Sequence, residues 1–145
     1  MNYDCYIASG WFNEKQLTDL NNIKSLCTKL NLKFFSPKDE ILVEPNSTLE
    51  IRNLAFKMNL DAINNCKFVI VNTRDKDLGT IFEAGYSFSK NKPIIYFCEG
   101  LVGNFNLMLS QSGNAVATTL EELEQHLINI QKDINYEAKY EGKTE

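Results

Sequence analysis

Glu83 is the side chain whose surroundings best suit nucleophilic chemistry. It lies in a run of small and apolar residues, 79–85, that follows turn-forming residues and opens a predicted helix over 80–89. The apolar neighbours would partly desolvate the carboxylate, whereas the N-terminus of the helix would favour its ionised form. This combination favours a nucleophile. The alternative interpretation is an exposed glutamate that only stabilises the start of the helix.

Further candidate binding residues follow the predicted strands. Gly10, Trp11 and Phe12 come after the first strand, where the two aromatic rings could sandwich a flat ligand ring. Asp77 comes after the third strand, and the Asn-Leu-Met segment at 106–108 comes after the fourth. Loops at the carboxyl ends of parallel strands converge, so we expect these side chains to share one site. Trp11 could instead be a packed core residue.

The sequence shows no phosphate-binding or metal-binding motif. Gly79-Thr80 alone is too short for a glycine-rich phosphate loop, and carboxylates at Asp77 and Glu83 would repel a phosphate, so an uncharged substrate is favoured. His126 is the only histidine and lies in a charged helical pattern, which we interpret as a solvated face. The four cysteines lack a CxxC pair and are interpreted as buried thiols. No metal or organic cofactor is expected.

An alternating series of strands and helices must position these side chains, which is the signature of a parallel sheet covered by helices. We predict a single-domain α/β fold with a flavodoxin- or Rossmann-like, mostly parallel five-stranded sheet and helices on both faces. One domain over residues 1–131 fits the length of 145 residues. The predicted strands are 6–8, 33–35, 68–71, 93–97 and 115–117. The predicted helices are 14–30, one capped by Ser47 that reaches about residue 65, 80–89, a turn at 107–109, and one capped by Thr119 that includes Ile130.

Two segments lie outside this alternation. Residues 38–47 are polar, contain Pro45 and show neither period, so we predict a loop near the edge of the sheet that can close over a ligand. Residues 132–145 form a polar tail. Tyr136 and Tyr140 in this tail indicate docking near the active site as an alternative to a free tail.

Composition argues against several classes of partner. The 15 basic and 19 acidic side chains give a net charge of −4 without a basic cluster, which disfavours binding to nucleic acid or to an anionic membrane. The longest apolar runs, such as 68–71, are far shorter than the roughly 20 residues that a membrane span needs. The first residues do not resemble a secretory signal, and a cytoplasmic location is expected.

The segment Asp77–Tyr86, with the sequence DLGTIFEAGY, and the Lys92-Pro93 pair after it resemble the signature of the nucleoside 2-deoxyribosyltransferases. The resemblance covers about residues 5–110 and is specific in the combination of its pieces. The other matching pieces are 6–12 for the first strand and loop, Arg52 with Phe56-Lys57 for the second helix, 106–108 for the late loop and 140–142 for the C-terminal segment.

The resemblance implies a retaining exchange, in which a glutamate attacks the anomeric carbon of a 2-deoxynucleoside, expels the base and passes the sugar to a second base. Glu83 matches this nucleophile, Tyr6 matches the tyrosine that orients it, and Asp77 matches a carboxylate that binds the sugar or base. The resemblance also implies a homo-oligomer built from dimers, such as a hexamer, in which Asn106 serves the neighbouring subunit's sugar hydroxyl. The residues expected to contact the deoxynucleoside or the free base are Gly10, Trp11, Phe12, Asn59, Gly79, Asn106 and Met108.

Asn59 departs from the family pattern, which has an aspartate at this position of the second helix. Asn59 can donate a hydrogen bond to a ring nitrogen but cannot deliver a proton. Asp61 cannot easily take over, because two residues along a helix turn a side chain by about 200°. We therefore expect slower catalysis, an altered base preference or loss of turnover, since general acid catalysis contributes roughly 10²–10⁴-fold.

Three functions therefore stay open at the level of sequence. The first is a deoxyribosyltransferase of purine and pyrimidine salvage. The second is a deoxynucleoside 5′-monophosphate N-glycosidase, although that relative typically has serines where Asp77 and Asn106 stand here. The third is a non-catalytic nucleoside- or nucleotide-binding protein, which the asparagine at position 59 motivates.

Overall fold

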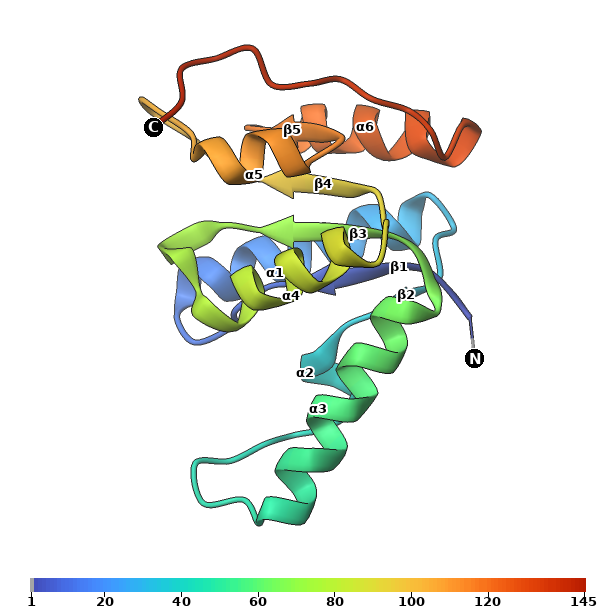
Figure 1. The fold of residues 1–145 in the computed structure, drawn as a ribbon, viewed down its shortest axis with the longest axis vertical. Coiled ribbons are helices and arrows are strands. Elements are labelled where there is room, and N and C mark those ends of the chain that lie inside the picture. Colours follow the sequence, from blue (N-terminus) through green and yellow to red (C-terminus); the bar gives the residue numbers. More distant parts are fainter. Residues whose placement is uncertain (1) are drawn as a thin grey trace.

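The computed structural model describes residues 2–145 and has a five-stranded, all-parallel sheet in the order β2-β1-β3-β4-β5. This is the flavodoxin-like strand order, with helices on both faces as predicted (Figure 1). The strands are β1 (Tyr3–Ala8), β2 (Phe34–Phe35), β3 (Cys66–Asn72), β4 (Ile94–Phe97) and β5 (Ala115–Ala117). The helices are α1 (Glu14–Lys29), α2 (Pro37–Glu40), α3 (Leu49–Asn64), the 3-10 turn η1 (Arg74–Lys76), α4 (Leu78–Ser89), α5 (Leu107–Ser112) and α6 (Leu120–Lys132).

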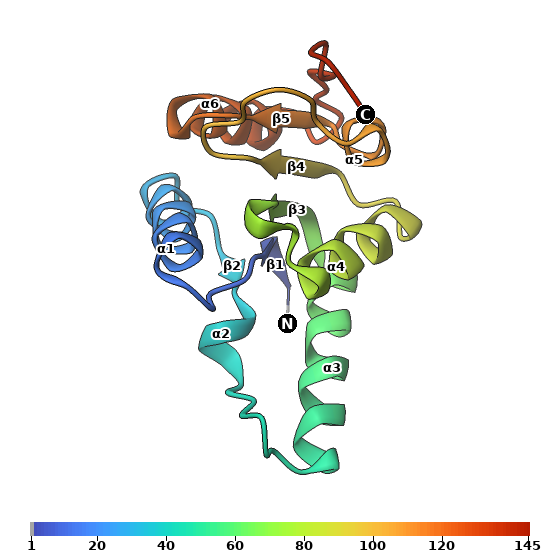
Figure 2. The same ribbon diagram turned by 90° about the vertical axis from the view of Figure 1, so that its left-hand side faces the viewer.

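The side chains of the central strands alternate between two core layers. Ile7 and Ile70 pack with residues of α1 and α6, whereas Tyr6 and Val69 pack with residues of α3 and α4 on the other face (Figure 2). All four side chains are fully buried. Because both faces of the sheet are covered, residues 68–71 of β3 form an uninterrupted apolar run rather than an alternating one, whereas Lys67 near the start of the strand is exposed.

Side-chain caps set the N-termini of the main helices. Asn13, Asp77 and Thr119 each accept a hydrogen bond from the backbone N–H three residues later, which satisfies a donor that the helix itself leaves unpaired. The predicted cap at Ser47 is wrong. Thr48 caps α3 instead, while the hydroxyl of Ser47 accepts from the backbone N–H of Glu44 at 2.7 Å.

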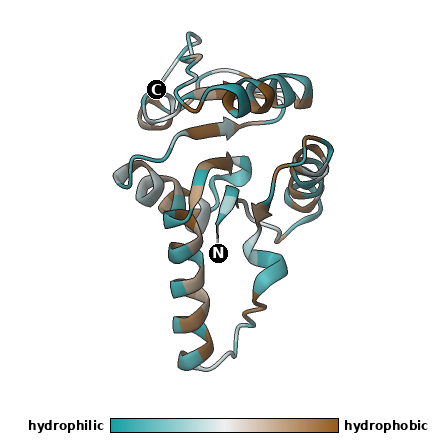
Figure 3. Ribbon diagram, turned by 90° about the vertical axis from the view of Figure 1, so that its right-hand side faces the viewer, coloured by the Kyte–Doolittle hydropathy of each residue, from teal (hydrophilic) through white to brown (hydrophobic). Residues whose placement is uncertain are grey.

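The segment predicted as a loop over 38–47 is partly helical. Pro37 occupies the first position of the short helix α2, where its fixed φ is preorganised and its missing N–H is not needed. The chain then leads into α3, whose N-terminal half extends away from the sheet (Figures 1 and 2). Apolar positions recur along this helix (Figure 3), and Leu49, Leu54 and Phe56 are exposed.

The residues after α6 run back along the edge of the sheet. The backbone N–H of Ala138 donates to Asn114 O at 2.7 Å, and Phe105 N donates to Lys143 O at 2.9 Å. The expected solvated position of His126 is wrong, because this half-buried ring has partners at both nitrogens. Its Nδ1 lies 2.8 Å from the Tyr136 hydroxyl, and its Nε2 lies 3.3 Å from Val116 O.

Candidate active site

Tyr6 and Glu83 meet on one side of the sheet, although 77 positions separate them in the sequence. Tyr6 lies in the buried strand β1, and its ring stacks on Phe35 of β2 with centroids 5.5 Å apart and planes 11° apart. Its hydroxyl donates a hydrogen bond to Glu83 Oε2. The rigid sheet therefore fixes the orientation of a carboxyl group that α4 carries.

The expectation that the start of the helix keeps Glu83 ionised is wrong. The helix α4 begins at Leu78, two residues before the predicted start, so Glu83 lies in its second turn. The field of a helix N-terminus falls off within the first turn. Burial dominates instead and raises the pKa of Glu83 to about 8. Burial therefore keeps this carboxyl mostly protonated at neutral pH.

Asp77 combines a structural role with a free carboxylate oxygen. Its Oδ2 accepts from the backbone N–H of Thr80 at 3.0 Å and from the Thr80 hydroxyl at 2.8 Å, which caps α4. Within residues 2–145 no hydrogen bond uses Oδ1, so this oxygen is available to a ligand. Gly79 lies in the exposed first turn of α4, where an added Cβ would be 3.7 Å from Asp77 Oδ2, an ordinary contact distance.

The side chain of Gln16 approaches Gly10 closely in the loop after β1. A Cβ there would lie 2.6 Å from Oε1 of Gln16. That same oxygen accepts a hydrogen bond from the backbone N–H of Phe12 at 2.9 Å. Gln16 therefore shapes this loop, a role that its place in the predicted helix 14–30 does not reveal.

The predicted sandwich of a ligand ring between Trp11 and Phe12 is wrong in this conformation. The two rings contact each other, with centroids 4.9 Å apart and planes inclined by 34°, and leave no space for a third ring. Trp11 packs against the core layer of α1 and α6, as its alternative interpretation has it. Phe12 is 71% exposed and stays available to a ligand on its outer face.

Asn59 lies on α3 between Phe56 and Asn64, whose side chains contact α4. Phe56 approaches Phe82 with ring centroids 6.1 Å apart, and the side-chain amide of Asn64 donates to the Tyr86 hydroxyl at 2.9 Å. Within the described residues, the buried Oδ1 of Asn59 has no hydrogen-bond partner. A buried acceptor without a donor is costly, so this oxygen is a natural contact for a donor on a ligand.

Asn106 and Met108 lie apart from Glu83. They line a cavity of about 680 Å³ with Leu78, Ile81 and Glu145 at the C-terminus. Ile81 and Glu83 are two residues apart on α4 and so project on nearly opposite sides of the helix, about 200° around its axis. A single chain therefore keeps the predicted late-loop residues on one side of α4 and the predicted nucleophile on the other.

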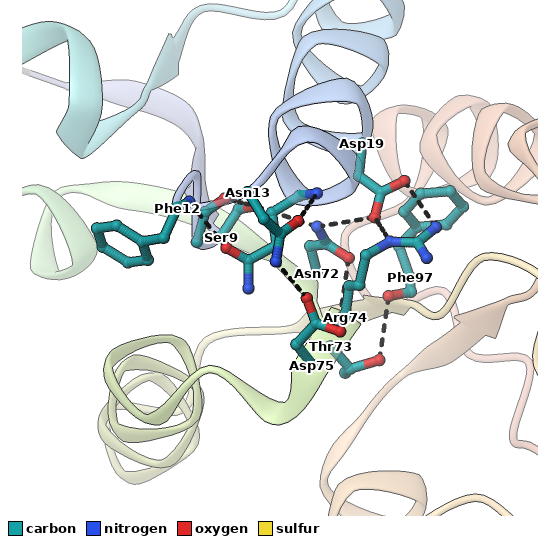
Figure 4. Close-up of polar contacts among 11 residues, drawn as sticks. Ser9, Phe12, Asn13, Asp19, Asn72, Thr73, Arg74, Asp75 and Phe97 are labelled. Atoms are coloured by element: carbon teal, nitrogen blue, oxygen red, sulfur yellow. Dashed lines mark hydrogen bonds and ion pairs between the residues drawn. The ribbon is translucent and has the colours of Figure 1, made fainter.

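Sequence reasoning also missed a polar cluster near the ends of β1 and β3 (Figure 4). Asp19 of α1 forms an ion pair with Arg74 of η1 and is 4% exposed. The one signal in the sequence is a charged residue beside Leu20, on the buried stripe of an amphipathic helix. In the part of the chain that the structure describes, no three His, Cys, Asp or Glu residues form a group that could hold a metal ion. No helix there is long and apolar enough to cross a bilayer.

Comparisons with known proteins give one family and one fold. The family model described as nucleoside 2-deoxyribosyltransferase matches residues 5–137. Among solved structures, a 2-deoxyribosyltransferase from the psychrotolerant bacterium Bacillus psychrosaccharolyticus shares 28% sequence identity and has a TM-score of 0.79. The match covers 94% of this chain and 98% of that chain. A comparison with curated proteins gave no match.

Two more distant structures share the fold. A conserved protein from Enterococcus faecalis V583 has 13% identity and a TM-score of 0.70, with 89% of this chain and 99% of that chain covered. A CMP N-glycosidase from Clostridium botulinum has 17% identity and a TM-score of 0.59, with 86% and 98% covered. At these identities the likeness shows the fold alone.

The raised pKa of Glu83 predicts a pH-dependent gain in stability for Glu83→Gln. The folded protein holds this carboxyl neutral up to a pKa of about 8, whereas an unfolded glutamate ionises near its model value of 4.5. Between these values the unfolded state binds fewer protons, so wild-type stability falls as pH rises. The free energy of unfolding of Glu83→Gln, relative to wild type, should therefore increase from pH 5 to pH 8 in denaturant titrations.

The same substitution at the exposed Glu50 is the matched control. A pH dependence of equal size in both variants would assign the effect to net charge rather than to the burial of Glu83.

Proposed function

The chain belongs to the nucleoside 2-deoxyribosyltransferase family, and we propose that it exchanges the base of a 2′-deoxynucleoside through a deoxyribosyl ester of Glu83, in nucleotide salvage. The observation that carries this proposal is the hydrogen bond from the Tyr6 hydroxyl to Glu83 Oε2. It holds one carboxyl oxygen in a partly buried place. No hydrogen bond among residues 2–145 uses Oε1, which is the oxygen available for attack.

The reaction consists of two displacements at the anomeric carbon. In the first, the ionised Glu83 Oε1 bonds to C1′, the bond from C1′ to the base nitrogen breaks, and the base leaves with the electron pair and takes up a proton from water. In the second, a ring nitrogen of the incoming base bonds to C1′, the ester bond breaks to restore the carboxylate, and the N–H proton of the incoming base passes to water, so that the protons balance over the exchange. Two inversions give net retention. A deoxyribose lacks the electron-withdrawing 2′-hydroxyl, so its oxocarbenium-like transition state forms more readily and one carboxylate suffices.

Glu83 must be ionised when it attacks, although burial raises its pKa to about 8. Two features favour the carboxylate once a substrate is bound. The Tyr6 hydroxyl donates to the carboxyl, and positive charge develops on the sugar beside it in the transition state. A carboxyl that burial makes costly to ionise therefore gains its largest stabilisation at the moment of reaction.

A homo-oligomer built from dimers is part of this proposal. Asn106 and Met108 lie on the side of α4 away from Glu83, so they reach a Glu83 site only from a neighbouring chain. Exposed apolar side chains near them support such a contact, since Leu78 is 85% and Met108 73% exposed. Asn106 uses Oδ1 to accept from Leu109 N at 3.1 Å, which leaves its amide N–H groups for a sugar hydroxyl.

The first experiment is a product assay with deoxyinosine and adenine. The proposal expects deoxyadenosine, identified by chromatography, and a deoxyribosyl adduct on the peptide 80–89 in mass spectrometry of denatured reaction mixtures. Glu83→Ala should lose at least roughly 10³-fold in rate, because removal of a nucleophile is among the most costly single changes. Glu50→Ala is the matched control.

The assay also separates the other functions. Release of free base from a deoxynucleoside monophosphate without an acceptor base would indicate a hydrolase rather than a transferase. Ligand binding without any product would indicate a binding protein. Full activity of Glu83→Ala would remove this residue from the role of nucleophile.

Asn59→Asp should raise turnover. The substitution introduces a group that can protonate the leaving base, a contribution of roughly 10²–10⁴-fold where it is well placed. The measurement is kcat for deoxyinosine and for a deoxypyrimidine nucleoside. Asn53→Asp, an equal change of charge at an exposed position of the same helix, is the control. An unchanged kcat in Asn59→Asp would show that the proton reaches the base by another route.

Complementation tests the shared site. Glu83→Ala and Asn106→Ser chains should each be nearly inactive, and serine keeps the cap of α5. When the two are co-expressed, half of the dimers are mixed and each mixed dimer has one intact site, so about a quarter of wild-type activity should return. No recovery in isolated mixed dimers would show that Asn106 does not act across an interface.

A further inference from the structure

A polar cluster ties together the loops that follow β1 and β3 (Figure 4). Arg74 donates to both carboxylate oxygens of Asp19, from Nε to Oδ2 and from Nη2 to Oδ1 at 3.1 Å. The amide of Asn72 donates to Asp19 Oδ2 at 3.3 Å and to the Ser9 hydroxyl at 3.1 Å. We call Ser9, Asp19, Asn72 and Arg74 the anchor cluster.

The anchor cluster is buried to an extent that stability alone does not explain. Asp19 is 4% exposed, Asn72 1% and Ser9 5%. A largely buried ion pair contributes little net stability compared with apolar residues of the same volume, because Asp19 loses its hydration and Arg74, whose side chain is 23% exposed, loses most of its own. The pair instead fixes an orientation. A guanidinium that donates hydrogen bonds to both oxygens of a carboxylate permits essentially one arrangement of Arg74 relative to Asp19.

Arg74 begins a strained turn, and its ion pair with Asp19 fixes the orientation of this turn. Asp75 and Lys76 both have left-handed backbones, with φ values of 61° and 52°. Such conformations persist in residues other than glycine only where the surroundings hold them. Further ties support the turn: the side-chain amide of Asn13 donates to Asp75 Oδ2 at 2.8 Å, and the Thr73 hydroxyl donates to Phe97 O at 3.3 Å. The turn leads directly into Asp77.

We propose that Asp19 and Arg74 are positioning residues that hold the 73–77 loop so that the Asp77 carboxylate meets the substrate. The inference rests on the proposed function, because Asp77 is the substrate contact in that reaction. The helix α4 is held separately, by packing of Ala84 in the core layer with β1 and β3 and by the contact between Tyr6 and Glu83. A displaced loop therefore weakens the binding of substrate while the nucleophile stays in place.

The test is Arg74→Lys, which keeps the positive charge and loses the two-pronged grip. A small misplacement of a binding group costs roughly 10–100-fold in kcat/KM. We expect the KM for the deoxynucleoside to rise about tenfold while kcat stays within about threefold of wild type, the pattern of lost uniform binding. Amide hydrogen exchange over residues 73–80 should become faster, and exchange in β3 should not change.

Lys29→Gln is the matched control, because it breaks another ion pair of α1, with Glu124 of α6 at 2.8 Å, far along the sequence from the loop. Its KM should equal that of wild type even if its melting temperature falls as much as that of Arg74→Lys. Should Arg74→Lys fail to fold, Asp19→Asn serves as the second variant, because the amide oxygen still accepts a hydrogen bond from the guanidinium.

Two results would overturn the inference: an unchanged KM with unchanged exchange over 73–80, or an equal rise of KM in Lys29→Gln. A wild-type protein without transfer activity would contradict the proposed function instead. Hydrogen exchange then still decides the positioning role, because faster exchange confined to residues 73–80 supports it and unchanged exchange there refutes it.

Discussion

The burial of one carboxyl group against a rigid tyrosine is the constraint on which the site depends. Tyr6 cannot move, because its strand pairs on both sides and its ring stacks on Phe35. Glu83 is therefore held in one orientation, and burial keeps its carboxyl group mostly neutral. Positive charge that develops on a bound sugar would favour the ionised form. The side chains of this site are held in place by the protein itself, and a neutral Glu83 avoids the free-energy cost of an unpaired buried charge.

The spacing on α4 separates the roles of the two carboxylates. Asp77 caps the helix and Glu83 follows six residues later, about 9 Å further along the axis. One oxygen of Asp77 is bound in the helix cap, and within residues 2–145 the other has no hydrogen-bond partner. In the proposed reaction Asp77 therefore holds another part of the ligand while Glu83 attacks.

The sequence predicts the architecture well because strand and helix periods are local properties, and most caps follow from single residues such as Asn13 and Thr119. It predicts the site less well wherever a contact joins distant segments. The helix α4 begins two residues before its predicted start, so Glu83 lies beyond the first turn. The residue types at Leu78 and Gly79 do not predict this earlier start. The position of Trp11 depends on its packing against the core, and the position of His126 depends on its contact with Tyr136 after α6. Neither contact can be predicted from a local sequence pattern.

The two faces of α4 carry different parts of the candidate site. One face carries Glu83 toward Tyr6, and the opposite face places Leu78 and Ile81 in the wall of the cavity beside α5. A helix of 12 residues moves as a rigid body, so a neighbour that filled this cavity would also restrict Glu83. In the proposed oligomer, assembly would then do more than deliver Asn106, because it would also hold the proposed nucleophile in the orientation that attack on a sugar requires.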